Sequence, residues 1–241
     1  MKKKNVGIIG CGRWGKKVIE ILANIANIKF ICNSKNNYKD FYLRDIEWVF
    51  ILTPDKTHNS IVEYYIKKKC NVFCEKPLTM CYRQSYNLYN LAKNNKVKLY
   101  VDDVENYKKK KFFIKKNNLI IRKKKDIGSA KSLLYRLAYH DFYLLYKYLI
   151  SEKFLKFNAK IYNHKLLLSI EGKKIFNFIY DINSKNKIHT INNCNFLNFD
   201  CNPLKDMLLD VLYSKKNFMM NKKISLFSNL IIDKFLEEIK K

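Results

Sequence analysis

A glycine-rich turn near the N-terminus is the part of this sequence whose residue types and spacing point most directly to chemistry. Gly10, Gly12 and Gly15 follow the apolar run VGII at the spacing G-x-G-x-x-G, with Arg13 and Trp14 between the last two. Glycines so spaced allow a tight turn, leave room for a pyrophosphate where a Cβ would stand, and let the next helix lie close to the strand. The following residues, KKVIEILANI, have helical apolar spacing, and a helix that begins here directs free N–H groups at an anion. We therefore predict that these five residues bind a dinucleotide; the alternative is a tight turn without a ligand.

The residues about twenty positions beyond the glycines bear on which dinucleotide would bind. An acidic side chain at this place accepts hydrogen bonds from the ribose of NAD, whereas this chain has Asn33, Ser34 and Lys35. Without a carboxylate to repel it, a 2′-phosphate could be held by the Ser34 hydroxyl and the Lys35 ammonium. The sequence therefore favours NADP over NAD, unless the loop simply faces water.

The composition restricts the classes of protein to which the chain could belong. Its 241 residues suffice for two modest domains, 48 % of them are apolar, and no apolar run reaches the roughly 20 residues of a membrane-spanning helix. The short apolar stretch at the N-terminus is interrupted by glycines, unlike a signal peptide, and the seven cysteines have neither zinc-site nor disulfide-ladder spacing. We expect a cytoplasmic protein with reduced thiols, no membrane contact and no metal site.

The net charge of +27, from 48 basic and 21 acidic residues, raises the question of a polyanionic partner. The lysines are spread along the whole chain among many Asn, Ile, Tyr and Phe residues, a mixture that A/T-rich coding produces without selection for a partner. The densest runs, KKKK at 108–111 and RKKK at 122–125, are typical of solvated faces. Nucleic-acid binding is therefore not expected; it would show as DNA affinity that falls with added salt.

The rest of the chain supplies the elements that must position the glycine turn. In the first hundred residues short apolar runs (VGII, IKFIC, WVFILT, NVFCE and VKLYV) alternate with helical segments, which is typical of a parallel sheet covered by helices on both faces. After about Val101 we expect a helical stretch with KKKKFFIKK, then strand-length segments such as LIIRKKK, SAKSLLYRL, KLLLSI and KIFNFIYD, with EGKK and INSKNK as turns. Two helices, over PLKDMLLDVLYS and SLFSNLIIDKFLEEIKK, end the chain.

The predicted fold class is therefore α/β, with two domains. The first is a doubly wound Rossmann domain over residues 1–103. The second is a smaller α+β domain with a mostly antiparallel open sheet over residues 104–241, and its C-terminal helix could pack back on the first domain.

Further residues of interest stand at the C-terminal ends of the predicted strands. The run DIEWVFILT leads into PDKTH, which places Thr53, Pro54 and His58 where ligands bind in open α/β sheets, and NVFCEKPLT contains Glu75 and Lys76. Together with GIIGCGRWG, these segments resemble the glucose-fructose oxidoreductase and inositol dehydrogenase family (Gfo/Idh/MocA). RLAYHDFYLLYKYL resembles that family's helix with a catalytic histidine, and the two C-terminal helical segments resemble its C-terminal helical pair.

The resemblance implies an NAD(P)-dependent oxidoreductase. Hydride transfer needs a nicotinamide held against a substrate carbon and a group that exchanges the alcohol proton. By resemblance, Lys76 would direct its ammonium at the nicotinamide and the reacting hydroxyl, with Glu75 as a local partner or cap. The residues that would line the nicotinamide half of the cofactor are Thr53, Pro54 and His58, of which His58 could instead cap the next helix.

His140 would be the catalytic acid and base, because the unperturbed pKa of imidazole lies nearest neutrality. In the family an aspartate commonly stands four residues earlier, one helical turn away, and tunes this histidine; here that position is Arg136. A cation at that distance would disfavour the imidazolium. Either Asp141 or a tyrosine therefore takes over the role, or catalysis is weak or absent. The tyrosines near enough in sequence are Tyr135, Tyr139 and Tyr143.

Two functions from different classes follow. The first is an oxidoreductase acting on a hydroxyl or carbonyl of a sugar, a cyclitol or a nucleotide-activated sugar, with Lys76 and His140 as catalytic residues. The second is a dinucleotide-binding protein with impaired catalysis that serves as a redox sensor or assembly partner, which Arg136 supports. The resemblance also implies that the second sheet faces the substrate on one side and a partner subunit on the other, giving a homodimer or homotetramer. The motifs encode neither the substrate nor the direction of reaction.

Overall fold

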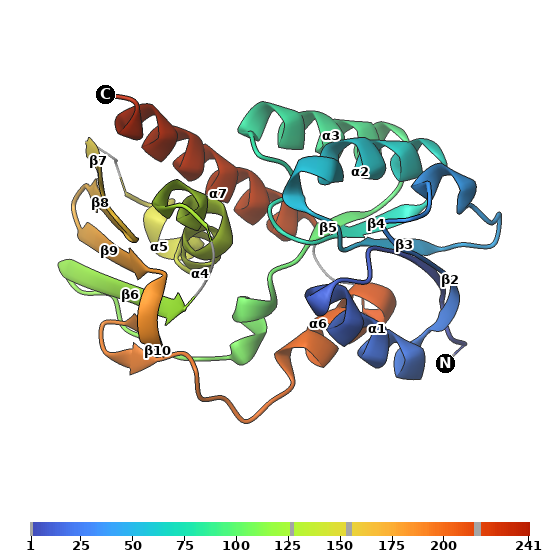
Figure 1. Ribbon diagram of the computed structural model, residues 1–241, viewed down its shortest axis with the longest axis horizontal. Helices are drawn as coiled ribbons and strands as arrows, with labels where there is room; N and C mark the ends of the chain where they lie inside the picture. Colours follow the sequence, from blue (N-terminus) through green and yellow to red (C-terminus); the bar gives the residue numbers. More distant parts are fainter. Residues whose placement is uncertain (1, 126–127, 153–155, 215–217) are drawn as a thin grey trace. The chain divides into compact units, whose positions relative to one another are not determined.

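The computed structural model describes residues 2–125, 128–152, 156–214 and 218–241 (Figure 1). The chain divides into two compact units: the first comprises Met1–Val104 and Pro203–Leu226, and the second comprises Glu105–Asn202 and Phe227–Lys241. All seven cysteines are free thiols. Within the described ranges, no helix is long and apolar enough to cross a membrane.

The first unit is built on a five-stranded parallel sheet with the strand order β2-β1-β3-β4-β5. The strands are β1 (Asn5–Ile9), β2 (Asn27–Cys32), β3 (Trp48–Ile51), β4 (Asn71–Cys74) and β5 (Leu99–Val101). Strands β3 and β5 are buried along their whole length, which is why their sequences read as continuous apolar runs. The predicted doubly wound Rossmann domain is confirmed. Because the strand order reverses between β1 and β3, a ligand is expected at the carboxyl ends of these strands.

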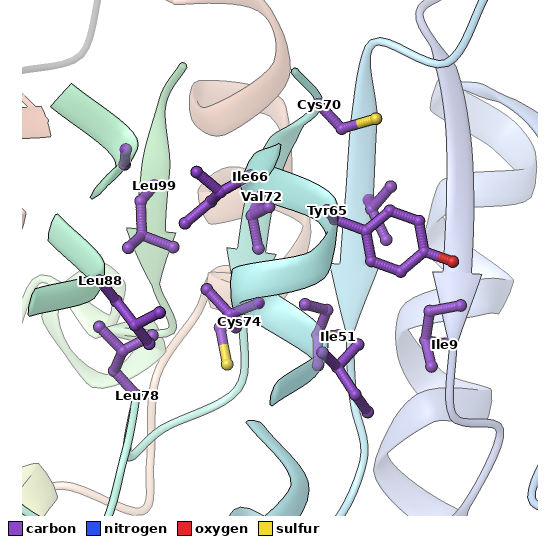
Figure 2. Close-up of a cluster of buried hydrophobic side chains, with 14 of the residues drawn as sticks. Ile9, Ile51, Tyr65, Ile66, Cys70, Val72, Cys74, Leu78, Leu88 and Leu99 are labelled. Carbon is purple, nitrogen blue, oxygen red and sulfur yellow. The ribbon is translucent and has the colours of Figure 1, made fainter. Parts of the chain in front are cut away.

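Helices cover both faces of this sheet (Figure 1). The helices of the unit are α1 (Arg13–Ile25), α2 (His58–Lys67), α3 (Tyr82–Asn94), α6 (Pro203–Tyr213) and the first part of α7 (Phe218–Ile239). Figure 2 shows part of the buried core of this unit, in which the ring of Tyr65 of α2 lies between Ile51 and Ile9 of the sheet. On the opposite face Phe50 and Phe73 pack with their ring centroids 5.1 Å apart. Because side chains are packed on both faces of the sheet, the strands are held in place, and so are the strand ends next to the predicted site.

The second unit contains a six-stranded sheet of order β11-β10-β6-β9-β8-β7, antiparallel except for the pair β6 and β9. The strands are β6 (Asn117–Lys125), β7 (Lys156–Tyr162), β8 (Lys165–Glu171), β9 (Ile175–Asp181), β10 (Asn183–Ile191) and β11 (Cys194–Asn195). The helices α4 (Tyr139–Leu144), α5 (Tyr146–Leu149) and the last part of α7 accompany this sheet. Phe142 of α4 packs between Phe178 of β9 and Phe235 of α7. The predicted mostly antiparallel sheet is confirmed.

Three local predictions in this unit are wrong. SAKSLLYRL, predicted as a strand, is helical: a 3₁₀ turn spans Ala130–Ser132 and a π-helical turn spans Leu134–Ala138, because its buried residues recur at helical rather than strand spacing. KKKKFFIKK is not helical after the 3₁₀ turn Val104–Lys108, since Lys109 adopts a left-handed φ of 53° and consecutive lysines repel one another. INSKNK, predicted as a turn, mostly belongs to β10, whose polar residues gave no apolar alternation.

Candidate active site

A cavity of about 720 Å³ lies at the carboxyl ends of β1, β2 and β3 in the first unit. This is the place where the strand order reverses, and the volume lies within the roughly 300–1,000 Å³ of small-molecule sites. The glycine turn forms one wall, and the segments that follow β2 and β3 form the others. The lining residues are Ile9, Gly10, Cys11, Gly12, Arg13, Trp14, Gly15, Cys32, Asn33, Ser34, Asn36, Tyr38, Leu52, Thr53, Pro54, Thr57 and Ile61.

The backbone of the glycine turn is shaped to receive a ligand. Gly10 has a φ of +100°, and a Cβ there would lie 2.5 Å from the Leu52 carbonyl oxygen. A Cβ on Gly12 would meet no atom within 4 Å, so the space in front of this residue is open. Gly12 is also the N-cap of α1, whose first turn carries no acidic side chain. The first N–H groups of α1 therefore remain available to an anion.

Trp14 adds a hydrogen-bond donor to this wall. Its indole nitrogen is buried and has no hydrogen-bond partner among the described residues. A buried donor without a partner costs free energy, and a polar ligand in the cavity would supply the missing acceptor. The predicted cofactor residues Gly10, Gly12, Arg13, Trp14 and Gly15 all line the cavity.

The segment after β2 presents neutral side chains to the cavity. Asn33 and Ser34 line it, and the Asn33 side-chain oxygen accepts a hydrogen bond of 2.8 Å from the Lys35 backbone N–H. Lys35 is exposed and does not belong to the lining. No carboxylate lies among the described residues of the lining.

The segment after β3 contains three of the predicted residues. Thr53 and Pro54 line the cavity, and the Thr57 hydroxyl donates to the Pro54 carbonyl at 2.7 Å. His58, by contrast, is fully buried and does not belong to the described lining of this cavity. Its Nδ1 lies 2.7 Å from the Pro77 carbonyl oxygen, and its Nε2 lies 2.8 Å from the Thr53 carbonyl oxygen. The expectation that His58 lines the cofactor is therefore wrong, and so is the helix-cap alternative, because the ring contacts carbonyls rather than helix N–H groups.

Glu75 and Lys76 follow β4, the next strand along the sheet. Lys76 is 8 % exposed, and the peptide bond between Lys76 and Pro77 is cis. A Glu75 carboxylate oxygen accepts the Lys76 backbone N–H at 3.0 Å, while the Glu75 N–H donates to the Ile51 carbonyl. Glu75 is thus the local partner expected of it, and it fixes the backbone on which Lys76 stands. Neither residue belongs to the lining of the cavity.

Asp102 stands beside this segment, a position that sequence reasoning did not predict. Its backbone N–H donates to the Cys74 carbonyl, because β4 and β5 are neighbours in the sheet. The side chain is 2 % exposed, and burial, followed by the nearby Glu75 carboxylate, raises its pKa well above the ordinary value.

His140 lies in the second unit, near the start of α4. Its Nδ1 is 3.0 Å from the Tyr143 hydroxyl, and this hydroxyl accepts the Glu105 backbone N–H at 3.0 Å. A tyrosine hydroxyl can accept a hydrogen bond and take part in a second one, so both contacts of Tyr143 can form together. Of the residues that the sequence left open as partners of His140, Tyr143 contacts it, and whether this contact supports catalysis stays a prediction.

Asp141 is fully buried and faces other partners. One oxygen accepts from Arg122 at 2.8 Å and lies 2.9 Å from His189 Nε2. Burial would raise the pKa of Asp141, but Arg122 and then His189 outweigh it and lower the pKa to about 2. Burial and Arg122 also lower the pKa of His189. Arg122, expected on a solvated face, is buried because it pairs with Asp141 and lies 3.6 Å from Glu105.

Arg136 does not occupy the helical position that the sequence suggested. It lies within the π-helical turn Leu134–Ala138, where the Tyr139 N–H bonds to the Leu134 carbonyl five residues earlier. Such a turn is wider than an α-helical one, so residues four apart no longer stand directly above one another. A Cβ on Gly128 would lie 3.0 Å from an Arg136 guanidinium nitrogen, which places this cation beside the preceding segment.

Comparison with known proteins agrees with the fold. Residues 23–103 match the Gfo/Idh/MocA oxidoreductase family at its NAD-binding Rossmann fold. Residues 23–103 of the first unit form a Gfo/Idh/MocA NAD-binding Rossmann fold. The match includes the segments PDKTH and CEKP, so the resemblance stated from these motifs is confirmed. No curated protein sequence matches the chain.

Solved structures of similar fold extend over nearly the whole chain. UDP-N-acetylglucosamine 3-dehydrogenase GnnA from Acidithiobacillus ferrooxidans is 14 % identical, with a TM-score of 0.81 over 99 % of this chain and 98 % of that one. A putative myo-inositol dehydrogenase from Sinorhizobium meliloti is 11 % identical, with a TM-score of 0.78 over 99 % and 98 %. GenD2 from gentamicin A biosynthesis, in complex with NAD, is 11 % identical, with a TM-score of 0.78 over 99 % and 94 %. At these identities the likeness establishes the fold of both units.

The structure therefore brings together most, but not all, of the predicted residues. Eight of the predicted cofactor residues meet in the Rossmann domain of the first unit; these are Gly10, Gly12, Arg13, Trp14, Gly15, Ser34, Thr53 and Pro54. Lys76 belongs to the first unit and His140 to the second, so their joint action stays a prediction. Sequence reasoning missed Asp102 and the contacts of Tyr143 with His140 and Glu105. A signal existed only for Tyr143, which stands three residues after His140 at helical spacing.

Proposed function

We propose that the protein is an NAD(P)-dependent oxidoreductase that transfers a hydride between the nicotinamide and a hydroxyl or carbonyl of a sugar, a cyclitol or a nucleotide-activated sugar. The observation that carries the proposal is the cavity of about 720 Å³ at the glycine turn. The residues present fit a dinucleotide, because the space in front of Gly12 is open and the buried Trp14 N–H lacks an acceptor among the described residues. When bound, the nicotinamide supplies the hydride donor or acceptor. The similar structures include a UDP-N-acetylglucosamine 3-dehydrogenase and a putative myo-inositol dehydrogenase, which supports this substrate class.

Lys76 and His140 are the proposed catalytic residues. The Lys76 ammonium would bind the reacting oxygen and exchange its proton, and Glu75 holds the backbone at this point through the Lys76 N–H. His140 would act as the second acid and base. Because Tyr143 engages Nδ1, proton exchange with the substrate would fall to Nε2.

The proposed cofactor is NADP, with NAD as the alternative. A carboxylate after β2 would bind the NAD ribose and repel a 2′-phosphate, and the described lining contains none. Ser34 lines the cavity and can donate its hydroxyl hydrogen to the phosphate. The exposed Lys35 next to it would supply the charge.

We also propose that the second unit pairs with another copy of this chain. On one face of its sheet, Ile121, Ile179 and Leu167 stand side by side in register on β6, β9 and β8, and all three remain only partly buried. Leu119 on the same face of β6 is 41 % exposed. An apolar row across three strands, if left in water, is an association surface, and a symmetric dimer would cover it.

A nucleotide titration followed by a turnover assay tests the oxidoreductase. The chain has two tryptophans: Trp14 lines the cavity, whereas Trp48 is buried in β3. NADPH should quench the Trp14 fluorescence, and Trp14→Phe should remove most of the quenching. Turnover on a panel of sugars and cyclitols should fall at least a hundredfold in Lys76→Ala, but not in Lys67→Ala, which changes an exposed lysine of α2.

The outcomes separate the two candidate functions. Nucleotide binding without turnover of any substrate would favour the catalytically impaired dinucleotide-binding protein, a redox sensor or assembly partner. Equal turnover in Lys76→Ala would remove Lys76 from the mechanism. Failure to bind either NADPH or NADH at millimolar concentration would refute both functions.

A further inference from the structure

The buried His58 connects two segments that the proposed reaction uses separately. It is the first residue of α2, and its side chain has no exposed surface. One ring nitrogen lies 2.7 Å from the Pro77 carbonyl oxygen, and the other lies 2.8 Å from the Thr53 carbonyl oxygen. Thr53 lines the dinucleotide cavity, whereas Pro77 directly follows Lys76. We infer that His58 is a positioning residue that ties the wall of the dinucleotide cavity to the segment that carries Lys76.

The chemistry of the ring suits a two-sided connection. Both of its partners are backbone carbonyls, which only accept hydrogen bonds. A neutral imidazole has one N–H and donates to one of them, whereas the imidazolium donates to both. No other side chain of this size offers a donor at each of two ring edges, so a substitution must give up at least one of the two contacts.

The two ends of the connection differ in what else can hold them. The Thr53 and Thr57 hydroxyl oxygens lie within hydrogen-bond distance, 2.8 Å apart, which helps to hold the start of the segment after β3. Pro77 is buried and has no N–H, so its carbonyl is the one backbone polar group through which it can be held. A shift of this carbonyl moves the peptide bond that it shares with the neighbouring residues, and Lys76 with them. The inference rests on the proposed function for the role of Lys76, but the connection itself does not.

Two substitutions of His58 each remove one of its two contacts and can keep the other. In His58→Asn the amide nitrogen stands near the position of Nδ1, so the Pro77 contact can persist while the Thr53 contact is lost. In His58→Gln the amide nitrogen reaches the position of Nε2, so the Thr53 contact can persist while the Pro77 contact is lost. The same two substitutions at His164, an exposed residue between β7 and β8, are the matched controls.

The expected kinetic result is a split between binding and turnover. His58→Gln should lower kcat by about tenfold to a hundredfold and leave the Kd for NADPH within about twofold, because the cavity wall keeps its contact. His58→Asn should raise the Kd for NADPH about tenfold, with a smaller effect on kcat. In a Lys76→Ala background, His58→Gln should lower kcat only a little further, since the substitution acts through Lys76. Equal losses of kcat and affinity in both variants, or full additivity with Lys76→Ala, would show a merely structural residue and overturn the inference.

Hydrogen exchange tests the connection without any turnover, and so separates its failure from failure of the proposed function. In the nucleotide-free protein, His58→Gln should speed exchange at residues 78–81 by about tenfold and leave residues 55–57 near the wild-type rate. His58→Asn should show the opposite pattern, and the His164 variants should show neither. If neither His58 variant folds, the wild-type protein still decides the question: NADPH bound beside Thr53 should slow exchange at residues 78–81, and unchanged rates there would contradict the connection.

Discussion

Substitution of Gly12 by alanine separates the binding role of the glycine turn from its structural role. Gly12 has ordinary extended backbone angles, φ −67° and ψ −171°, which alanine also adopts. An added Cβ meets no atom within 4 Å, so it causes no clash in the ligand-free protein. Alanine is a poorer N-cap than glycine by up to about 1 kcal/mol, but it gains about 0.4–1 kcal/mol by restricting the unfolded chain. The free energy of unfolding should therefore change by less than about 1 kcal/mol.

Nucleotide binding should respond much more strongly to the same change. The new methyl group stands in the open space in front of the turn, where the pyrophosphate is proposed to lie. We expect the Kd for NADPH to rise at least a hundredfold, which corresponds to about 2.7 kcal/mol. Gly10→Ala is the contrasting variant: its φ of +100° costs alanine about 1–3 kcal/mol, and its Cβ would lie 2.5 Å from the Leu52 carbonyl oxygen. That variant should lose stability as well as binding.

Urea unfolding and a fluorescence titration with NADPH measure the two quantities on the same samples. A Gly12→Ala protein that binds NADPH with wild-type affinity would refute the placement of the phosphates over this turn. A Gly12→Ala protein that is strongly destabilised would refute the open space inferred from the backbone.

Three further predictions concern the second unit. The pKa of Asp141 is lowered to about 2 in the folded protein, below its ordinary 3.8, so this carboxylate stabilises the fold above about pH 4 and the contribution is lost as the pH falls toward 2. Asp141→Asn should remove that part of the pH dependence and cost on the order of 3 kcal/mol at neutral pH, measured by urea unfolding across this range; an unchanged pH profile would contradict the buried ion pair. Tyr143→Phe removes the contact to His140 and should lower turnover about tenfold and shift the pH–rate profile, without changing the Kd for NADPH; an unshifted profile would mean that this tyrosine does not tune the histidine. Ile179→Lys places a charge in the apolar row of β9 and should convert the proposed dimer to a monomer in light scattering, whereas an unchanged mass would place the interface elsewhere.

Much of the first unit could be predicted because its signals are local. The apolar runs that become β3 and β5 are continuous since both faces of a parallel sheet are buried, and the glycine spacing fixes the turn after β1 within a few residues. The second unit was harder to predict. The polar residues of β10 show no alternation of apolar and polar side chains. The strand forms because it pairs with β6, which lies some sixty residues earlier in the sequence.

The residues of the candidate site also divide into those that the local sequence predicts and those that it does not. Residues whose proposed roles depend on their own backbone or motif, such as Gly12 and Lys76, can be predicted from their neighbours in the sequence. Residues whose role depends on distant partners are not: Asp102 is significant because β4 and β5 lie side by side, and Arg122 because Asp141 faces it from α4.

By itself, then, the sequence determined the turn that would hold a pyrophosphate, the parallel sheet behind it and the family to which they point, because strand period, glycine spacing and short motifs are properties of a few consecutive residues. Only the tertiary structure decided that His58 faces two carbonyls instead of a cofactor, and that Asp141 pairs with Arg122 while Tyr143 contacts His140. These outcomes depend on which groups packing brings within 3 Å of one another and on how deeply it buries them, and neither quantity is written in the local pattern.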